Sequence, residues 1–210
     1  MARAILIAAL LVPGAAHALS DFTDRPEIPE QMIGLQGRLG AGALVGEGAG
    51  DVDQPPLSHV SISLHVRLLP EWYLELSSFG ERTLNAEAPE GKTILGIEGT
   101  TGGIRWRPLL SSKESGNRLV LGVGGGGGRI FVQGKGLPGE GESFGGGEAY
   151  VLAGFEKELY GDQYSAGYVG LEGVAQQYFV DEDSPFRGTG VTVRMTFSYY
   201  MGGSYCAECW

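Results

Sequence analysis

Apolar and polar residues alternate with a period of two along most of the chain. The clearest case is the segment 59–69, in which the apolar Val60, Ile62 and Leu64 are separated by serines. Such alternation is typical of a β-strand with one apolar and one polar face. The pattern resumes after a short proline-containing break, in the segment 73–81. These two segments therefore predict a β-hairpin.

Matching the apolar faces of this hairpin gives a predicted register. Val66 then lies opposite Leu76, and Arg67 lies opposite Glu75. This register needs an odd number of connecting residues, most simply the three at 70–72. The polar face is therefore expected to carry a cross-strand ion pair between Arg67 and Glu75.

The same reasoning predicts eight strands without intervening helices. They cover about 32–47, 59–69, 73–81, 97–107, 118–132, 148–159, 164–179 and 189–200. In the fourth, the alternation changes phase between Ile97 and Ile104, so the intervening Gly99–Gly103 predicts a β-bulge. The run Gly124–Gly128 has strand patterns on both sides and lacks the Lys-Ser/Thr ending of a phosphate loop, so it is interpreted as strand with a bulge or close backbone packing.

Eight strands in an up-and-down order form a closed antiparallel barrel, which can have either side facing outward. A soluble barrel buries the apolar side chains, whereas a transmembrane barrel turns them toward lipid and fills its interior with polar groups. The connections alternate in length: those after the first, third, fifth and seventh strands are longer, acidic and rich in Gly and Pro. This asymmetry is typical of transmembrane barrels, and we predict an all-β, eight-stranded antiparallel up-and-down transmembrane β-barrel.

Aromatic residues gather near the predicted strand ends, where the two membrane interfaces are expected. At the short-turn ends these are Trp72, Trp106, Tyr160, Tyr164 and Tyr199, and toward the long-loop ends they are Phe79, Phe131, Tyr150, Tyr178 and Phe179. Phe197, near the end of the last strand, is predicted to belong to the same interface set.

Charged residues recur on the polar faces of the strands. In a transmembrane barrel these side chains point inward, and eight strands leave just enough room for side chains to fill the lumen. The predicted lumen charge network comprises Arg38, Arg67, Glu75, Glu98, Arg105, Arg107, Glu172 and Arg194. Two roles are open for this network: a plug of satisfied ion pairs, or a narrow pore gated by exchange of partners between Arg67 and Glu75.

A predicted targeting signal and the strand pattern together divide the chain into four parts. Arg3, an apolar run and the Ala16-His17-Ala18 cleavage pattern predict a secretory signal peptide over 1–18, since the run is too short to span a bilayer. A polar lead-in follows at 19–31, then the barrel at 32–200 and a tail at 201–210 that contains Cys206 and Cys209. Two cysteines alone make a poor metal site, and the βαβ surroundings of a redox Cys-x-x-Cys motif are absent. In an exported protein we therefore expect these cysteines to form a terminal disulfide or to remain as thiols.

These features together resemble a known family. The signal peptide, the eight strands, the ending TVRMTFSYY at 192–200 and the turn into the Gly-rich strand at 108–130 are similar to the small outer-membrane barrels of Gram-negative bacteria, of the OmpA-transmembrane-domain, OmpX and OmpW type. The resemblance implies a place in the outer membrane, contact with its lipid and lipopolysaccharide, and recognition of the last strand by the barrel-assembly machinery. The chain departs from the pattern by continuing past Tyr200.

Three functions remain open from the sequence. The first is an integral outer-membrane protein, a monomer with a structural, adhesive or narrow-pore role and with no cofactor, metal site or catalytic residues. The second is a soluble periplasmic binder of a small apolar ligand, similar to a lipocalin. The third is an enzyme that modifies lipid A, since His59-Val60-Ser61 matches the spacing of a deacylase motif, although Ile62 replaces its asparagine. The formal net charge of −10 excludes a nucleic-acid partner.

Overall fold

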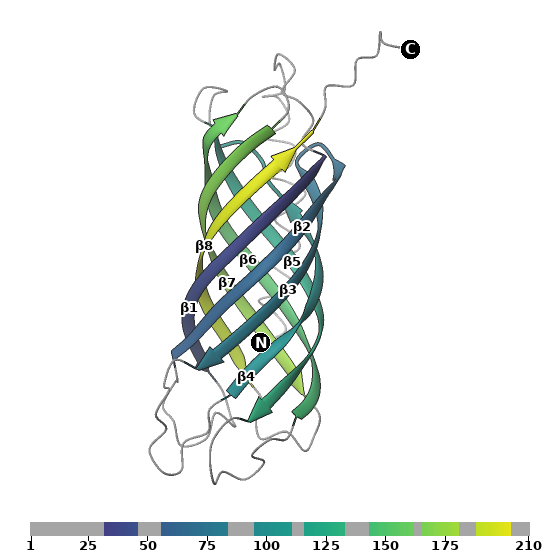
Figure 1. Cartoon of the computed structure of the whole chain (residues 1–210), viewed down its shortest axis with the longest axis vertical. Helices are drawn as coiled ribbons and strands as arrows, with labels where there is room; N and C mark the ends of the chain where they lie inside the picture. Colours follow the sequence, from purple (N-terminus) through teal and green to yellow (C-terminus); the bar gives the residue numbers. More distant parts are fainter. Residues whose placement is uncertain are drawn as a thin grey trace, which may run out of the picture.

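The computed structural model is a closed barrel of eight antiparallel strands (Figure 1). It describes residues 32–45, 56–83, 95–110, 116–132, 143–161, 165–180 and 188–202. The strands are β1 (Ile33–Val45), β2 (Pro56–Leu69), β3 (Trp72–Thr83), β4 (Leu95–Trp106), β5 (Asn117–Val132), β6 (Ser143–Gly161), β7 (Ser165–Val180) and β8 (Thr189–Met201). Each strand pairs with its neighbours in sequence, and β1 pairs with β8 to close the sheet. Within the described ranges there is no helix long and apolar enough to span a membrane.

The barrel has two distinct ends. At the turn end, β2 and β3 are joined through Pro70 and Glu71, and β1 begins beside the end of β8 (Figure 1). At the opposite end, called the loop end here, β1 finishes and β2 begins. The predicted signal peptide, the polar lead-in, Tyr164 and the tail cysteines Cys206 and Cys209 lie outside the described residues.

The large apolar side chains face outward. Val60, Ile62, Val193 and Phe197 are between 50% and 61% exposed, which a water-soluble barrel would not tolerate over such a wide surface. The side chains between them, among them Ser61, are buried inside. The predicted all-β transmembrane barrel is therefore confirmed, and a lipocalin-like interior is not what the chain forms.

The hairpin register differs from the prediction by two residues. Val66 pairs with Leu74, His65 lies opposite Glu75, and Arg67 lies opposite Tyr73. The turn is also shorter, because Trp72 already belongs to β3 and a register shift follows Arg67. Glu71 occupies the tight turn with a positive φ of 68°. The apolar pattern correctly predicted which residues share a face. It could not distinguish two registers that differ by two residues, because both keep the same residues on each face.

The fourth strand contains no bulge. β4 keeps one register with both neighbours, so Ile97, Thr101 and Arg105 all face the lumen. Ile97 breaks the apolar-outward pattern because it packs inside with Phe79 and Ile130 at the loop end. The alternation changes phase in the sequence because the interior is apolar near Ile97 and polar near Arg105, and not because the strand contains a bulge.

The glycine run of β5 is continuous strand, as predicted, without a bulge. Gly126 faces inward opposite Thr101, and a Cβ there would clash with the carbonyl oxygen of Thr100 in the neighbouring strand. Gly127 faces outward, where the nearest atom to an added Cβ is the carbonyl oxygen of Gly146 at 3.7 Å. The close approach of β4 and β5 therefore requires glycine on the inner face only.

This difference predicts unequal effects of two adjacent substitutions. Gly126→Val should destabilise the folded barrel by about 1–3 kcal/mol or more, because the added side chain forces β4 and β5 apart. Gly127→Val, the matched control, should leave stability within about 1 kcal/mol of the parent protein, because the strand interior favours β-branched residues. The temperature at which the folded, heat-modifiable gel band disappears measures both effects. Equal transitions for the two variants would contradict this account of the glycine run.

Candidate functional site

The lumen of the barrel is the candidate functional site, since it gathers most of the buried polar groups of the described strands. Alternation within each strand sends every second side chain inward, and these inner positions carry arginine, glutamate, histidine, glutamine and tyrosine. They form three clusters: one at the turn end, one in the centre and one toward the loop end.

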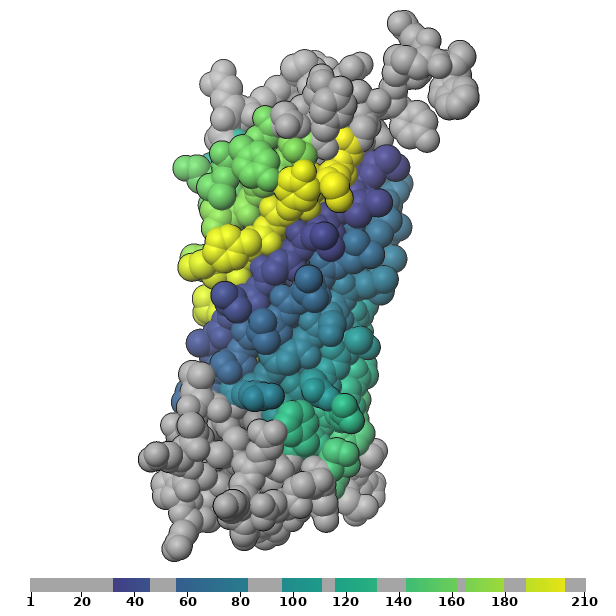
Figure 2. Space-filling view, in the orientation of Figure 1, coloured from purple at the N-terminus to yellow at the C-terminus, as the bar shows by residue number. Residues whose placement is uncertain are grey.

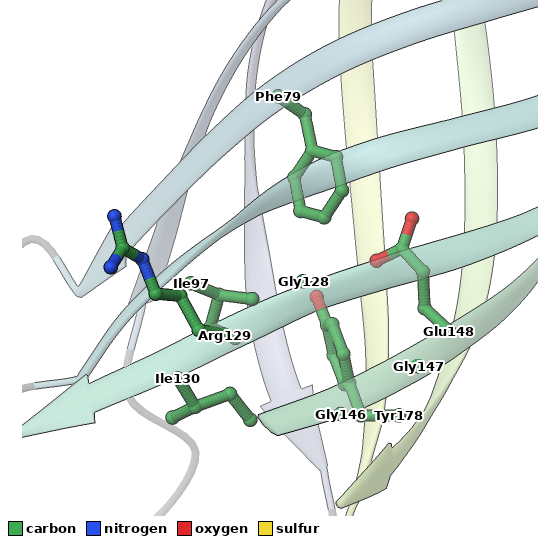
Figure 3. Close-up of a pocket in the computed structure, with 9 residues that line it drawn as sticks. All are labelled: Phe79, Ile97, Gly128, Arg129, Ile130, Gly146, Gly147, Glu148 and Tyr178. Atoms are coloured by element: carbon green, nitrogen blue, oxygen red, sulfur yellow. The ribbon is translucent and has the colours of Figure 1, made fainter. Parts of the chain in front are cut away.

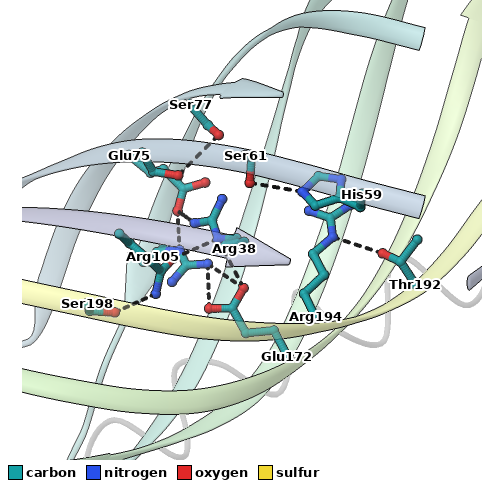
Figure 4. Close-up of polar contacts among 12 residues, drawn as sticks. Arg38, His59, Ser61, Glu75, Ser77, Arg105, Glu172, Thr192, Arg194 and Ser198 are labelled. Carbon is teal, nitrogen blue, oxygen red and sulfur yellow. Dashed lines mark hydrogen bonds and ion pairs between the residues drawn. The ribbon is translucent and has the colours of Figure 1, made fainter. Parts of the chain in front are cut away.

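The central cluster joins four strands through two arginines and two glutamates (Figure 4). Arg38 on β1 places Nη2 2.5 Å from Oε2 of Glu75 on β3, and its Nε lies 3.4 Å from Oε2 of Glu172 on β7. Arg105 on β4 donates from Nη2 to both oxygens of Glu172 at 2.8 Å, and its Nε pairs with Glu75. Each arginine thus bridges both carboxylates, so the four charges form a closed ring across the lumen.

Further side chains from β2 and β6 complete the coordination of Glu75. Tyr150 on β6 donates its hydroxyl to Oε1 at 3.1 Å, and Nε2 of His65 on β2 lies 3.1 Å from Oε2. Gln36 accepts a hydrogen bond from Nε of Arg38 at 2.7 Å. Since all of these side chains are almost completely buried, the ring replaces water with protein partners.

The turn-end cluster centres on Arg107, immediately after β4. Its Nε and Nη2 donate to Oε2 of Glu156 on β6 at 2.9 and 2.5 Å. The guanidinium also lies among three tyrosine rings, 3.9 Å from the centroid of Tyr200, 5.0 Å from Tyr168 and 5.2 Å from Tyr73. Aromatic faces attract a desolvated cation, so this cage stabilises the charge and closes the lumen at the turn end.

The cluster toward the loop end is built around Glu81 on β3. Its carboxylate accepts hydrogen bonds from Gln176 at 2.7 and 2.8 Å and from the hydroxyl of Tyr178, both on β7. Nδ1 of His59 lies 2.8 Å from Oε1, and Nη2 of Arg194 lies 3.4 Å from the same oxygen. Glu81 therefore links β2, β3, β7 and β8.

Beyond Glu81 the interior becomes apolar. Leu44, Leu57, Phe79, Ile97 and Ile130 pack together there with the ring of Tyr178. Figure 3 shows a small pocket in this region, into which the side chain of Glu148 projects. Its accessible volume is only about 10 Å³. Among the described residues, none hydrogen-bonds to the buried Oε2 of Glu148. An apolar layer thus caps the charged lumen at the loop end.

Six of the eight residues predicted for the lumen network face inward and belong to these clusters: Arg38, Glu75, Arg105, Arg107, Glu172 and Arg194. Glu98 does not. It lies on the outer face of β4 with its side chain 44% exposed, and it pairs with Arg129 at 2.5 Å. The phase change predicted for this strand is absent, which puts Glu98 on the face opposite Ile97.

Arg67 also differs from the prediction. It is partly exposed at the turn end, and its Nε donates to the carbonyl oxygen of Leu69 at 3.4 Å. Glu75, the predicted partner, is bound by Arg38 and Arg105 instead. The structure therefore does not contain the Arg67–Glu75 pair on which the predicted gate depends.

The predicted interface aromatics divide into two groups. Tyr160, Phe179, Phe197 and Tyr199 are exposed on the outer face. Trp72, at the turn end, is partly exposed. Trp106 stacks on Trp72 and is only 5% exposed. Three aromatics expected near the outer interface instead point into the lumen: Phe79, Tyr150 and Tyr178. They occupy inner positions because the interior itself contains aromatic and apolar layers.

Sequence reasoning missed several partners in the lumen, above all Glu81, Glu156, Gln176 and Tyr200. Glu81 and Glu156 stand on inner positions of their strands, and the adjacent residues of opposite charge, Arg82 and Lys157, are exposed. Strand parity alone could have assigned them to the interior. His59 lies opposite Glu81 on the neighbouring strand. The other partners come from strands distant in sequence, so those pairs carry no local signal.

The histidine-serine motif does acquire a nearby acid. Oγ of Ser61 lies 2.9 Å from Nε2 of His59, whose Nδ1 faces Glu81 at 2.8 Å. This order of groups is that of a serine hydrolase triad. However, Ser61 is 6% exposed and points into the packed lumen, and Glu81 is shared with Gln176, Tyr178 and Arg194. The arrangement is that of a satisfied polar network.

Comparisons with known proteins support the fold. No family model and no curated protein matches the chain. Among solved structures it is similar to Neisserial surface protein A, with a TM-score of 0.55 and 13% identity over 81% of this chain and 96% of that one. Looser likenesses are the N-terminal β-barrel of OprF from Pseudomonas aeruginosa (TM-score 0.43, 12% identity, 81% and 98% coverage) and Ail from Yersinia pestis in complex with the heparin analogue sucrose octasulfate (0.44, 14%, 80% and 97%).

A closed eight-stranded barrel with an apolar belt and a polar interior is the architecture of outer-membrane proteins. The first of these structures has the same fold, at an identity too low to carry a function with it. The side-chain orientation and the shared fold agree on a transmembrane β-barrel.

The buried ring predicts a strong dependence on Glu75. Glu75→Gln leaves Arg38 and Arg105 to share the single carboxylate of Glu172. The loss of one charge from the ring should cost about 3–5 kcal/mol of stability, as is typical when one partner of a buried ion pair is removed. Glu98→Gln is the matched control, since an exposed pair contributes at most about 1 kcal/mol. Urea unfolding of the barrel in lipid vesicles, followed by tryptophan fluorescence, measures both. Similar losses in the two variants would refute the closed ring.

Proposed function

We propose that the protein is a structural barrel of the outer membrane with a closed lumen, which anchors its external segments rather than conducting solutes. The observation that supports this most directly is the ring of Arg38, Glu75, Arg105 and Glu172, whose members come from opposite walls of the barrel. Groups that satisfy one another across the lumen leave no row of unpaired charges to guide an ion.

The layers on either side of the ring reinforce this closure. The tyrosine cage of Arg107 fills the turn end, and the apolar cluster with Leu44 and Phe79 fills the loop end. An ion would have to cross an apolar layer and displace buried ion pairs, and both steps carry a desolvation cost. The protein's role then depends on its outer surface and on the segments beyond its loop end.

Conductance measurements test this proposal. The barrel, folded and inserted into a planar bilayer, should show no steady single-channel current at moderate voltage. Arg38→Ala combined with Glu75→Ala removes one bridge across the lumen and should increase current events above the parent level, provided that gel mobility shows the variant to be folded. A steady ohmic current from the parent protein would contradict a closed lumen.

A second candidate, a lipid A hydrolase, is favoured by the contact of His59 with both Ser61 and Glu81. We expect no such activity, because a nucleophile that points into a packed lumen cannot reach an ester held in the membrane. Mass spectrometry of lipid A from cells that express the parent protein, Ser61→Ala or no protein should give the same spectrum. A loss of acyl mass that depends on Ser61 would instead establish the enzyme.

A further inference from the structure

The lipid-facing surface of the barrel is uneven. On β1, β2, β7 and β8 it carries mostly large apolar side chains, such as Ile62, Val193 and Phe197. On the adjoining strands the outer positions are small: Ser78 and Gly80 on β3, Thr100 and Gly102 on β4, and Gly125 and Gly127 on β5. The side of the molecule that carries β1 to β4 faces the viewer in Figure 2.

An open groove crosses β2, β3, β4 and β5 where these two kinds of surface meet. It is an open depression with an accessible volume of about 660 Å³. Its raised side is formed by Leu35, Ile62, Leu64 and Leu76, and its low side by Gly102 and Gly127. All four raised residues are exposed and apolar, so the groove presents a hydrocarbon-like wall at membrane depth.

The strand packing does not require this hollow. A Cβ added to Gly102 would meet Cδ2 of Leu76 at an ordinary contact distance of 3.7 Å, and one added to Gly127 finds a similar margin. At the inner position of Gly126, by contrast, an added Cβ would clash. Larger residues would therefore fit at the outer positions of Gly102 and Gly127, although not at Gly125, where an added Cβ would clash with the carbonyl oxygen of Glu148. The space beside Gly102 and Gly127 is available to a bound molecule.

Charged residues lie beside the groove on its loop side. Along β5, Arg129 follows Gly127 by one outward position, and it pairs with Glu98 on β4. Arg82, exposed on β3, lies two outward positions from Ser78 toward the loop end, opposite Gly96. Two arginines and one glutamate give this site a net positive charge. Phe131 packs over Gly96, which lies opposite Arg82 on the neighbouring strand. This position is typical of aromatic residues at the headgroup boundary.

We propose that this surface binds one phosphorylated lipid of the outer leaflet, with an acyl chain in the groove and a phosphate on Arg82 and Arg129. An acyl chain matches the apolar wall of Leu64 and Leu76, and an anionic phosphate complements the two guanidinium groups. Glu98 orients Arg129 through its 2.5 Å ion pair. The inference rests on the proposed membrane placement, in which the loop end meets the outer leaflet.

Native mass spectrometry of the detergent-solubilised, full barrel tests the site. The probe is a bisphosphorylated lipid A, and the comparison is the same lipid after enzymatic removal of its phosphates. The parent protein should retain one molecule of the phosphorylated lipid and should bind the dephosphorylated form about tenfold more weakly, the loss expected when two basic side chains at the headgroup boundary lose their partner.

Two matched pairs of variants separate the contributions. Arg82→Ala combined with Arg129→Ala should lower binding about tenfold, whereas Lys157→Ala, an exposed cation on the outer face at the turn end, should not change it. Gly102→Leu fills the groove and should abolish the single retained lipid. Gly37→Leu places the same side chain on β1, outside the groove and with no atom within 4 Å of the added Cβ, and should bind as the parent does.

Folding is verified first by heat-modifiable gel mobility, and Gly127→Leu replaces Gly102→Leu if the latter does not fold. Equal binding of both lipid forms, or equal effects of the groove variant and Gly37→Leu, would overturn the inference. A dimer that Gly102→Leu dissolves would also overturn it, since a second copy would then occupy the groove. Failure of the parent barrel to insert into vesicles would instead refute the membrane placement.

Discussion

Pairing of buried charges is the constraint on which the rest of this barrel depends. Glu75, held by Arg38 and Arg105, and Glu81, held by residues of three other strands, connect walls that are far apart in sequence. The bilayer gives the outer surface no way to solvate a misplaced arginine, and exposing one to lipid costs about 2–4 kcal/mol near the membrane centre. A strand that slipped by one residue would bring its charges outward. The ion pairs therefore specify the register of the sheet as well as its stability.

Strand parity was the part of the fold that the sequence could predict. Alternation assigned Val60, Ile62 and Val193 to the lipid side and Arg38, Arg105 and Arg194 to the lumen, because each assignment depends only on neighbours two residues apart. Pairing was not predictable in the same way. His65, and not Arg67, lies opposite Glu75, since two registers of equal parity match the apolar faces and only contacts from β1 and β4 distinguish them. Glu98 was misplaced because the phase change near it was attributed to the backbone.

A second source of error was the assumption of a uniformly polar lumen. The interior varies along the axis, from a tyrosine cage around Arg107, through the charged ring, to an apolar layer with Phe79 and Ile97. Phe79, Tyr150 and Tyr178 therefore occupy inner positions although their chemistry suits a membrane interface. The prediction placed these three residues by residue type, whereas strand parity would have assigned them to the interior. For a barrel this narrow, inward apolar residues are part of the packing.

The contact between β1 and β8 has a consequence for how the chain reaches its native state. Ile33 pairs with Met201, so the seam joins residues at the two extremes of the barrel sequence. Loop closure over such a separation is slow, and until it occurs β1 and β7 each present an unpaired edge. A ribosome-released chain truncated before Thr189 would keep both edges permanently. Such a fragment is expected to aggregate or be degraded, because the barrel cannot close without its last strand.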